Sequence, residues 1–294
     1  MMDENPQPSA GQPLSAEPLP AAPAKKSFPT LGDLFAMLGI ALGMQIVAGL
    51  VLTVALAVMG KLSEVWSPEQ QGAITAATYL LSLLPAYLLV LLYCRMRGGS
   101  VCIGRFSMRG LNPVLLGWGF LFIMAAGVVC EPLFAVLPAP PDLDFGRGLW
   151  AVLTLIVAAP VLEELLCRGA VLGMLRTRFG VVASWLLSSL FFGVLHVHPM
   201  LVVNAFVIGL ILGYIYLVSE SLWATMALHA LNNTVAYFMM ISGRGDILLM
   251  DMIGSRGLYV SVYIGAVVVT ALSAWMVWRK LRRLKEAAEN PVLE

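Results

Sequence analysis

The chain has 294 residues, of which 60% are hydrophobic and only 12% are charged, and its formal net charge is +1. Soluble domains carry about 25% charged residues, so this composition excludes an ordinary soluble protein and predicts an all-α integral membrane protein. The near-zero net charge gives no reason to expect nucleic-acid binding. The four cysteines form neither a CxxC pair nor a disulfide framework, which favours reduced thiols.

The first segment, residues 1–30, differs in composition from the rest of the chain. It contains seven of the 17 prolines, with Ser, Gln and Glu between them, and too little apolar surface to fold alone. We therefore expect a disordered cytoplasmic tail. No basic stretch opens it and no short apolar stretch follows, so it is not a cleavable signal peptide. Lys25 and Lys26 instead precede a long apolar run, as in an uncleaved anchor.

Eight apolar segments then follow, each near the roughly 20 residues that a transmembrane helix needs. Thr30 and Asp33 resemble a capping box at the first helix start, and Pro113 suits the first turn of the third helix. The segments are expected within the domain 31–278. They are residues 31–59, 72–94, 112–136, 148–175, 181–197, 199–218, 222–241 and 257–278.

The distribution of charge between the predicted loops indicates an orientation. With eight spans both termini lie on one side, which holds 13 of the 18 Lys and Arg residues, against four on the other side. The remaining one, Arg168, lies inside a span. Because basic loops stay in the cytoplasm, both termini are predicted to be cytoplasmic. Residues 279–294 are predicted to form a basic helix at the cytoplasmic lipid surface, where anionic headgroups would attract it.

The fourth span contains ionisable residues in an apolar run, which is costly in a bilayer and usually functional. Glu164 and Arg168 are four residues apart and can pair on one helical face, so that each charge neutralises the other. Glu163 points about 100° away and has no local partner, so it can act as a general base. Pro160 removes a backbone donor and could widen the helix, which would admit water. The alternative is that these charges only hold helices together.

Two later spans each carry a histidine. His196 follows Phe192 by four residues, and His229 precedes Asn233 by four, so His229 and Asn233 share a helical face. Two polar groups on one face predict a shared polar cavity. With a rise of about 1.5 Å per residue, both histidines, the asparagine and Glu163 all fall near the middle of the bilayer. They could therefore form one cluster.

Two further polar residues lie near span ends. Glu131 precedes Pro132 near the outer end of the third span, and Asn204 lies near the start of the sixth. Either could line the cavity, but solvation of a helix end or a hydrogen bond between helices is the preferred explanation.

One carboxylate, two imidazoles and an amide suit the attack of water on a carbonyl group. In this interpretation Glu163 accepts the water proton, while His229 and Asn233 donate to the developing oxyanion. His196 either holds the water or binds a metal. Glu163, His196 and His229 are plausible ligands of a divalent ion such as zinc, but no HExxH motif is present, so the spacing does not demand a metal.

The motifs EExxxR (Glu163 to Arg168), FxxxH (Phe192 to His196) and HxxxN (His229 to Asn233) follow one another on apolar spans. This order resembles the CAAX protease and bacteriocin-processing family, the CPBP or Abi group of intramembrane endopeptidases. The motifs cover about residues 150–240. The resemblance implies an eight-helix fold with a catalytic cavity in the membrane. It also implies hydrolysis of a peptide bond near a substrate C-terminus or within a membrane peptide.

The resemblance further implies a role for each motif residue. Glu163 would activate water, and His196 would be its partner at the water or metal. His229 and Asn233 would form the oxyanion or metal side of the site. Family members are often named metalloproteases, and a metal-free glutamate mechanism has also been proposed for them, so both mechanisms stay open at this point. The residues expected in supporting roles are Glu164, Arg168 and Phe192.

The expected partners are membrane lipid and a peptide or membrane-protein substrate, lipidated or not. A prenylated CaaX protein requires a prenylating host. In a bacterium, where the chain would lie in the plasma (inner) membrane, secreted peptides, leader peptides or membrane proteins are the expected substrates. One alternative is a non-catalytic membrane binder of the same fold, such as an immunity protein. The other is a proton-coupled transporter, although the two halves show no convincing inverted repeat.

Overall fold

The computed structural model describes residues 28–99, 102–139, 144–245 and 247–289. Within these ranges the chain is helical, with one isolated antiparallel bridge between Phe106 and Ser221. Almost all of the predicted N-terminal tail lies outside the described residues. The elements in chain order are α1 (Leu31–Val58), α2 (Pro68–Met96), η1 (Met108–Gly110), α3 (Pro113–Phe134), α4 (Gly148–Val152), η2 (Leu153–Ala158), α5 (Ala159–Glu164), η3 (Leu165–Leu172), α6 (Gly173–Leu175), α7 (Val181–Val194), α8 (Pro199–Ser219), α9 (Leu222–Ile241), α10 (Leu249–Ile253) and α11 (Arg256–Glu289).

All eight predicted spans correspond to helices, but not all have the length and apolar character of a membrane-crossing helix. Within the described ranges six do: α1, α2, α3, the continuous helix from α4 to α6, α8 and α11. α7 is only 14 residues long, or about 21 Å, which is shorter than the roughly 30 Å of hydrocarbon in a bilayer. α9 is long enough, but the polar residues of HxxxN make it less apolar. The protein is thus all-helical and fits a multi-pass membrane protein, while the count of eight spans and the side of the termini stay predictions.

The predicted helix starts are confirmed where the sequence marked them. The side chain of Thr30 accepts a hydrogen bond from the backbone N–H of Asp33, and the Asp33 carboxylate accepts one from the N–H of Thr30, which completes the capping box. Pro113 begins α3, and the side chain of Asn112 caps it. Asp33 also accepts a hydrogen bond from Arg97 Nε at 2.9 Å. The start of α1 is therefore joined to the end of α2.

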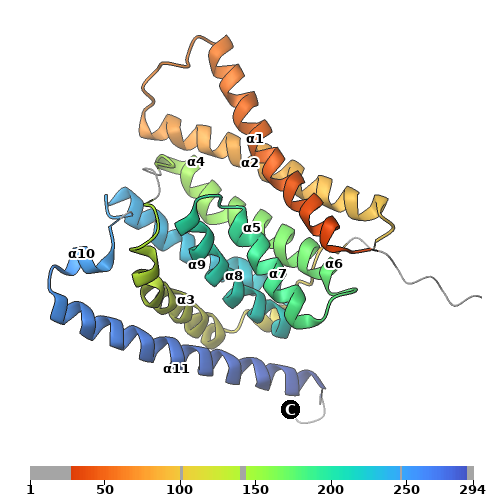
Figure 1. Cartoon of the computed structure of the whole chain (residues 1–294), viewed down its shortest axis with the longest axis vertical. Helices are drawn as coiled ribbons and strands as arrows, with labels where there is room; N and C mark the ends of the chain where they lie inside the picture. Colours follow the sequence, from red (N-terminus) through yellow and green to blue (C-terminus); the bar gives the residue numbers. More distant parts are fainter. Residues whose placement is uncertain (1–27, 100–101, 140–143, 246, 290–294) are drawn as a thin grey trace, which may run out of the picture.

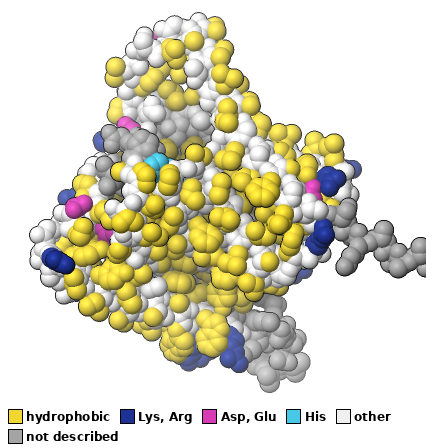
Figure 2. Space-filling view, in the orientation of Figure 1, with side chains coloured by type: hydrophobic (Ala, Val, Ile, Leu, Met, Phe, Trp, Pro, Cys, Tyr) yellow, Lys and Arg dark blue, Asp and Glu magenta, His cyan; other side chains and the backbone are white. Residues whose placement is uncertain are grey.

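The helices form three groups (Figure 1). α1 pairs with α2 on one side, α11 packs along α3 on the opposite side, and the helices from α4 to α9 lie between these pairs. Fully buried apolar side chains connect the groups, for example Val90 of α2, Leu115 of α3, Leu166 of η3 and Leu212 of α8. On the face drawn in Figure 2, apolar side chains cover much of the surface and charged ones lie towards its edges, as expected for contact with lipid. The motif residues lie in the central group.

Candidate active site

The fourth span is not a uniform α-helix. Two π-helical stretches, η2 and η3, flank the short α-helix that ends with Glu163 and Glu164. Such wide turns occur frequently at functional sites. In η2 the N–H of Ala159 donates to the carbonyl of Thr154 instead of Leu155. The next residue, at position 160, is a proline and has no N–H to donate. The Leu155 carbonyl therefore receives no backbone hydrogen bond from residue 159 or residue 160.

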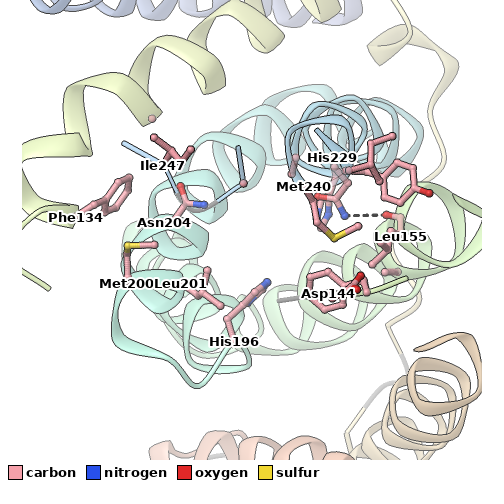
Figure 3. A pocket seen from close by; sticks show the side chains of 18 of the residues that line it. Phe134, Asp144, Leu155, His196, Met200, Leu201, Asn204, His229, Met240 and Ile247 are labelled. Carbon is pink, nitrogen blue, oxygen red and sulfur yellow. Dashed lines mark hydrogen bonds between the residues drawn. The ribbon is translucent and has the colours of Figure 1, made fainter. Parts of the chain in front are cut away.

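The side chain of Asn233 in α9 donates a hydrogen bond to the carbonyl of Leu155. Its Nδ2 lies 2.9 Å from the Leu155 oxygen, the contact drawn as a dashed line to Leu155 in Figure 3. The Asn233 Oδ1 accepts a hydrogen bond from Asn232 Nδ2 at 3.2 Å. Because an amide nitrogen carries two hydrogens, the second is available to the cavity that Asn233 lines. The wide turn before Pro160 thus orients the amide of the HxxxN motif.

The predicted pairing of Glu164 with Arg168 is confirmed. Arg168 Nη1 lies 2.7 Å from Glu164 Oε1, and both side chains are fully buried. Arg168 Nη2 donates to the carbonyl of Gly209 at 3.0 Å, and the guanidinium lies 4.7 Å from the centroid of the Phe192 ring. Phe192 in turn makes edge contacts with the rings of His196 and His229, with centroids 5.1 and 5.5 Å apart. Phe192 therefore connects all three motifs.

His229 connects the two adjacent glutamates. Its Nδ1 lies 3.2 Å from Glu164 Oε1, and its Nε2 lies 3.5 Å from Glu163 Oε2. An ionised carboxylate can only accept hydrogen bonds, so the hydrogen in the Glu164 contact must be on Nδ1. Nε2 is then the nitrogen that can exchange a proton with Glu163. The prediction that Glu163 lacks a partner holds within its own helix, but in the fold His229 of α9 faces it.

A cavity of about 650 Å³ brings the predicted catalytic residues together. Glu163, His196, His229 and Asn233 all line it, as expected from their shared depth. The side chain of His196 points into this space in Figure 3. Its Nδ1 donates to the carbonyl of Phe192 at 3.0 Å, which leaves Nε2 of a neutral ring as a hydrogen-bond acceptor towards the cavity.

The structure does not group Glu163, His196 and His229, the three side chains considered as metal ligands, around one common position. Among the described residues, no group of three or more His, Cys, Asp or Glu side chains is placed to hold a metal ion. His229 contacts Glu163 through Nε2 and Glu164 through Nδ1. His196 faces the cavity from the end of α7, held by its own helix. The proposed mechanism therefore uses only the side chains that line the cavity.

The weaker candidates Glu131 and Asn204 also line the cavity. Glu131 accepts a hydrogen bond from the backbone N–H of Met250 in α10, at 3.1 Å. Sequence reasoning did not select Tyr79 of α2, or the loop residues Asp144 and Arg147, although all three line the cavity. Tyr79 resembles any aromatic residue in an apolar run, and the loop residues show no periodic pattern. No signal in the sequence alone could have found them.

The comparison with known families agrees with this geometry. Residues 145–235 match the family model of the Rce1-like type II CAAX prenyl endopeptidases. The matched range begins in the loop before α4 and ends within α9, so it contains all three motifs. No curated protein and no solved structure matches the chain. The match confirms the resemblance to the CAAX protease family, which implies CAAX-type intramembrane protease activity at the level of the family.

Proposed function

We propose that the protein is an intramembrane endopeptidase that hydrolyses a peptide bond of a membrane-associated protein or peptide. The observation that carries this proposal is the contact of Glu163 Oε2 with His229 Nε2, 3.5 Å apart, at the wall of a cavity that Asn233 and His196 also line. A carboxylate base, an imidazole and an amide donor thus surround a space large enough for a peptide segment. The family match supports the same class of reaction.

The reaction proceeds in two stages. First, Glu163 removes a proton from a water molecule in the cavity, and the water oxygen attacks the scissile carbonyl carbon. His196 orients this water by accepting its other hydrogen at Nε2. The second amide hydrogen of Asn233 donates to the oxyanion that forms. The tetrahedral intermediate then collapses, the C–N bond breaks, and the proton held by Glu163 passes to the leaving amine, directly or through His229 Nε2.

The remaining motif residues act by positioning the catalytic side chains. Glu164 accepts the Nδ1 hydrogen of His229 and thereby sets which ring nitrogen faces Glu163. Arg168 neutralises the Glu164 carboxylate and holds it in place through its 2.7 Å contact. Phe192 packs against the guanidinium and both imidazole rings. These three side chains are positioning residues and do not need to touch the substrate.

The test is a comparison of membrane and secreted peptides from cells that carry either the wild-type chain or Glu163→Gln at matched expression. The expected result is a set of cleaved termini that is present with the wild type and absent with the variant. Glu64→Gln, which changes an exposed carboxylate in the loop between α1 and α2, is the matched control and should retain the cleaved termini. Identical peptide profiles for all three proteins would reject the protease and favour the non-catalytic binder.

A further inference from the structure

The helical bundle has two chemically different ends. At the first, Arg97 Nε meets Asp33 at 2.9 Å and Arg178 Nη1 donates to the carbonyl of Pro29 at 3.0 Å. Arg105 pairs with Glu220, the residue that follows α8. These contacts bring together residues 28–34, 95–99, 102–112, 175–181 and 216–222, which we call the basic end. It therefore contains the starts of α1, α3, α7 and α9 and the ends of α2, α6 and α8.

The opposite end is joined by a different set of contacts. The N–H of Arg147 donates to the carbonyl of Pro68 at 2.7 Å, and its guanidinium donates to the carbonyl of Ile241 at 3.4 Å. Glu131 accepts from the N–H of Met250. These contacts bring together residues 59–69, 131–137, 144–149, 241–245 and 247–256, which we call the cavity end. The cavity reaches this end, where it is lined by Phe134, Asp144, Phe145, Gly243, Ile247 and Leu248.

None of the residues that line the cavity within the described ranges comes from the basic end. The cavity therefore leads from the four predicted catalytic residues to the cavity end and not to the basic end. Glu163 lies 15 positions after the start of α4, which is about 22 Å along a helix. An extended peptide covers this depth with about seven residues, at about 3.3 Å each. A peptide that reaches Glu163 must therefore pass through a long part of the cavity.

The two ends differ in basic charge. The cavity end holds four basic residues, Lys61, Arg147, Arg244 and Arg256. The basic end and the last turns of α11, which lie near one another in Figure 1, hold eleven. These are Arg95, Arg97, Arg105, Arg109, Arg176, Arg178, Arg279, Lys280, Arg282, Arg283 and Lys285.

Aromatic residues mark the same boundary on α11. The guanidinium of Arg279 lies 5.3 Å from the ring of Trp275, and that of Arg282 lies 5.6 Å from the ring of Trp278. Tryptophan beside arginine is typical of the boundary between lipid and water. Basic segments that flank membrane spans stay in the cytoplasm. The basic end and the last turns of α11 hold eleven Lys and Arg residues, against four at the cavity end. This excess assigns the basic end to the cytoplasmic side of the membrane.

We propose that the catalytic cavity opens to the non-cytoplasmic side and takes an extended, largely apolar peptide segment presented there. The cleavage of that segment rests on the proposed function, whereas the side of the opening does not. Phe134, Met200, Leu201 and Ile247 supply apolar contacts in the cavity, and the Asn204 amide can hydrogen-bond a peptide backbone. The substrate class is thus an exported peptide, or the outer part of a membrane-anchored protein, rather than the C-terminus of a prenylated cytoplasmic protein.

Cysteine labelling tests the side of the opening without any need for a substrate. In a background that lacks Cys94, Cys102, Cys130 and Cys167, single cysteines replace exposed, uncharged residues, so the charge balance between the two sides is unchanged. Val65→Cys and Ser242→Cys report on the cavity end, and Thr177→Cys and Met96→Cys report on the basic end. Intact cells are treated with a membrane-impermeant maleimide, before and after permeabilisation.

The cavity itself is tested with Asn204→Cys and a small, positively charged methanethiosulfonate reagent. The expected result is labelling of the cysteines at positions 65, 242 and 204 in intact cells, while those at 177 and 96 react only after permeabilisation. The reverse pattern, or labelling of position 204 from the cytoplasmic side alone in inverted vesicles, would overturn the proposal. Labelling does not depend on hydrolysis, so this failure is distinguishable from a failure of the Glu163→Gln experiment.

Discussion

Glu163 and His229 meet across two helices, with Glu163 Oε2 at 3.5 Å from His229 Nε2. The other nitrogen of the same ring lies 3.2 Å from Glu164, so one imidazole contacts two carboxylates that are neighbours in the sequence. Since Arg168 neutralises Glu164, the two carboxylates have different environments. Glu164 is held in a fixed ion pair, and Glu163 faces the cavity as the base.

The contacts of His229 predict a large loss of activity in His229→Ala. This change removes both the orientation of the imidazole by Glu164 and the proton exchange with Glu163, so we expect a fall in kcat of about 10²- to 10⁴-fold. The measurement is the rate of cleavage of the identified peptide by purified protein in proteoliposomes. The control is Ser242→Ala, an exposed position at the end of α9. A kcat within a factor of three of the wild type would contradict the proposed role.

The buried ion pair predicts a strong effect of Arg168→Met on stability. The substitution leaves the Glu164 carboxylate buried without its partner, which should lower the free energy of unfolding by about 3–5 kcal/mol. The double variant Arg168→Met with Glu164→Gln removes the unpaired charge and should recover much of that loss. Both are measured by unfolding in mixed detergent micelles. Equal stability of the single and double variants would show that the ion pair is not what holds these helices.

The wide turn before Pro160 predicts an effect on catalysis without a loss of folding. Pro160→Ala restores an N–H that can donate to the Leu155 carbonyl and so competes with Asn233. Asn233 then loses its fixed orientation, and kcat should fall more than KM changes. The fall should be smaller than for Asn233→Ala, which removes an oxyanion donor worth about 10²- to 10³-fold.

The matched control for this variant is Pro85→Ala, which changes a proline inside α2. Both variants restore a helical N–H, so both should keep or gain stability, but only Pro160→Ala should lower kcat. If the two variants have the same kcat, Pro160 does not position Asn233.

The arrangement of the acidic and imidazole groups predicts activity without a bound divalent ion. No cluster of three possible ligands occurs among the described residues, so dialysis against a strong chelator should leave the cleavage rate unchanged. Elemental analysis of the active protein should then find less than one zinc per chain. Loss of activity on chelation, with recovery on addition of zinc, would show that the side chains rearrange around an ion.

Much of the local structure could be predicted from residue spacing. The apolar runs indicate helices, Thr30 and Asp33 mark a helix start, and residues four apart such as Glu164 and Arg168 pair on one face. These features depend on interactions within a single helix, whose geometry is nearly constant. The count of eight spans stays a prediction: among the described residues six helices have the length and apolar character needed to cross a membrane, and α7 has only 14 residues.

Contacts between helices could not be predicted in this way. His229 faces Glu163, and Asn233 binds the Leu155 carbonyl, because η2 changes the helical register and because α9 packs against it in one particular rotation. Spacing alone gives the depth of a residue along its own helix, but not which neighbour it faces. The cavity and the end at which it opens follow from the packing of several helices together, and only the folded chain shows them.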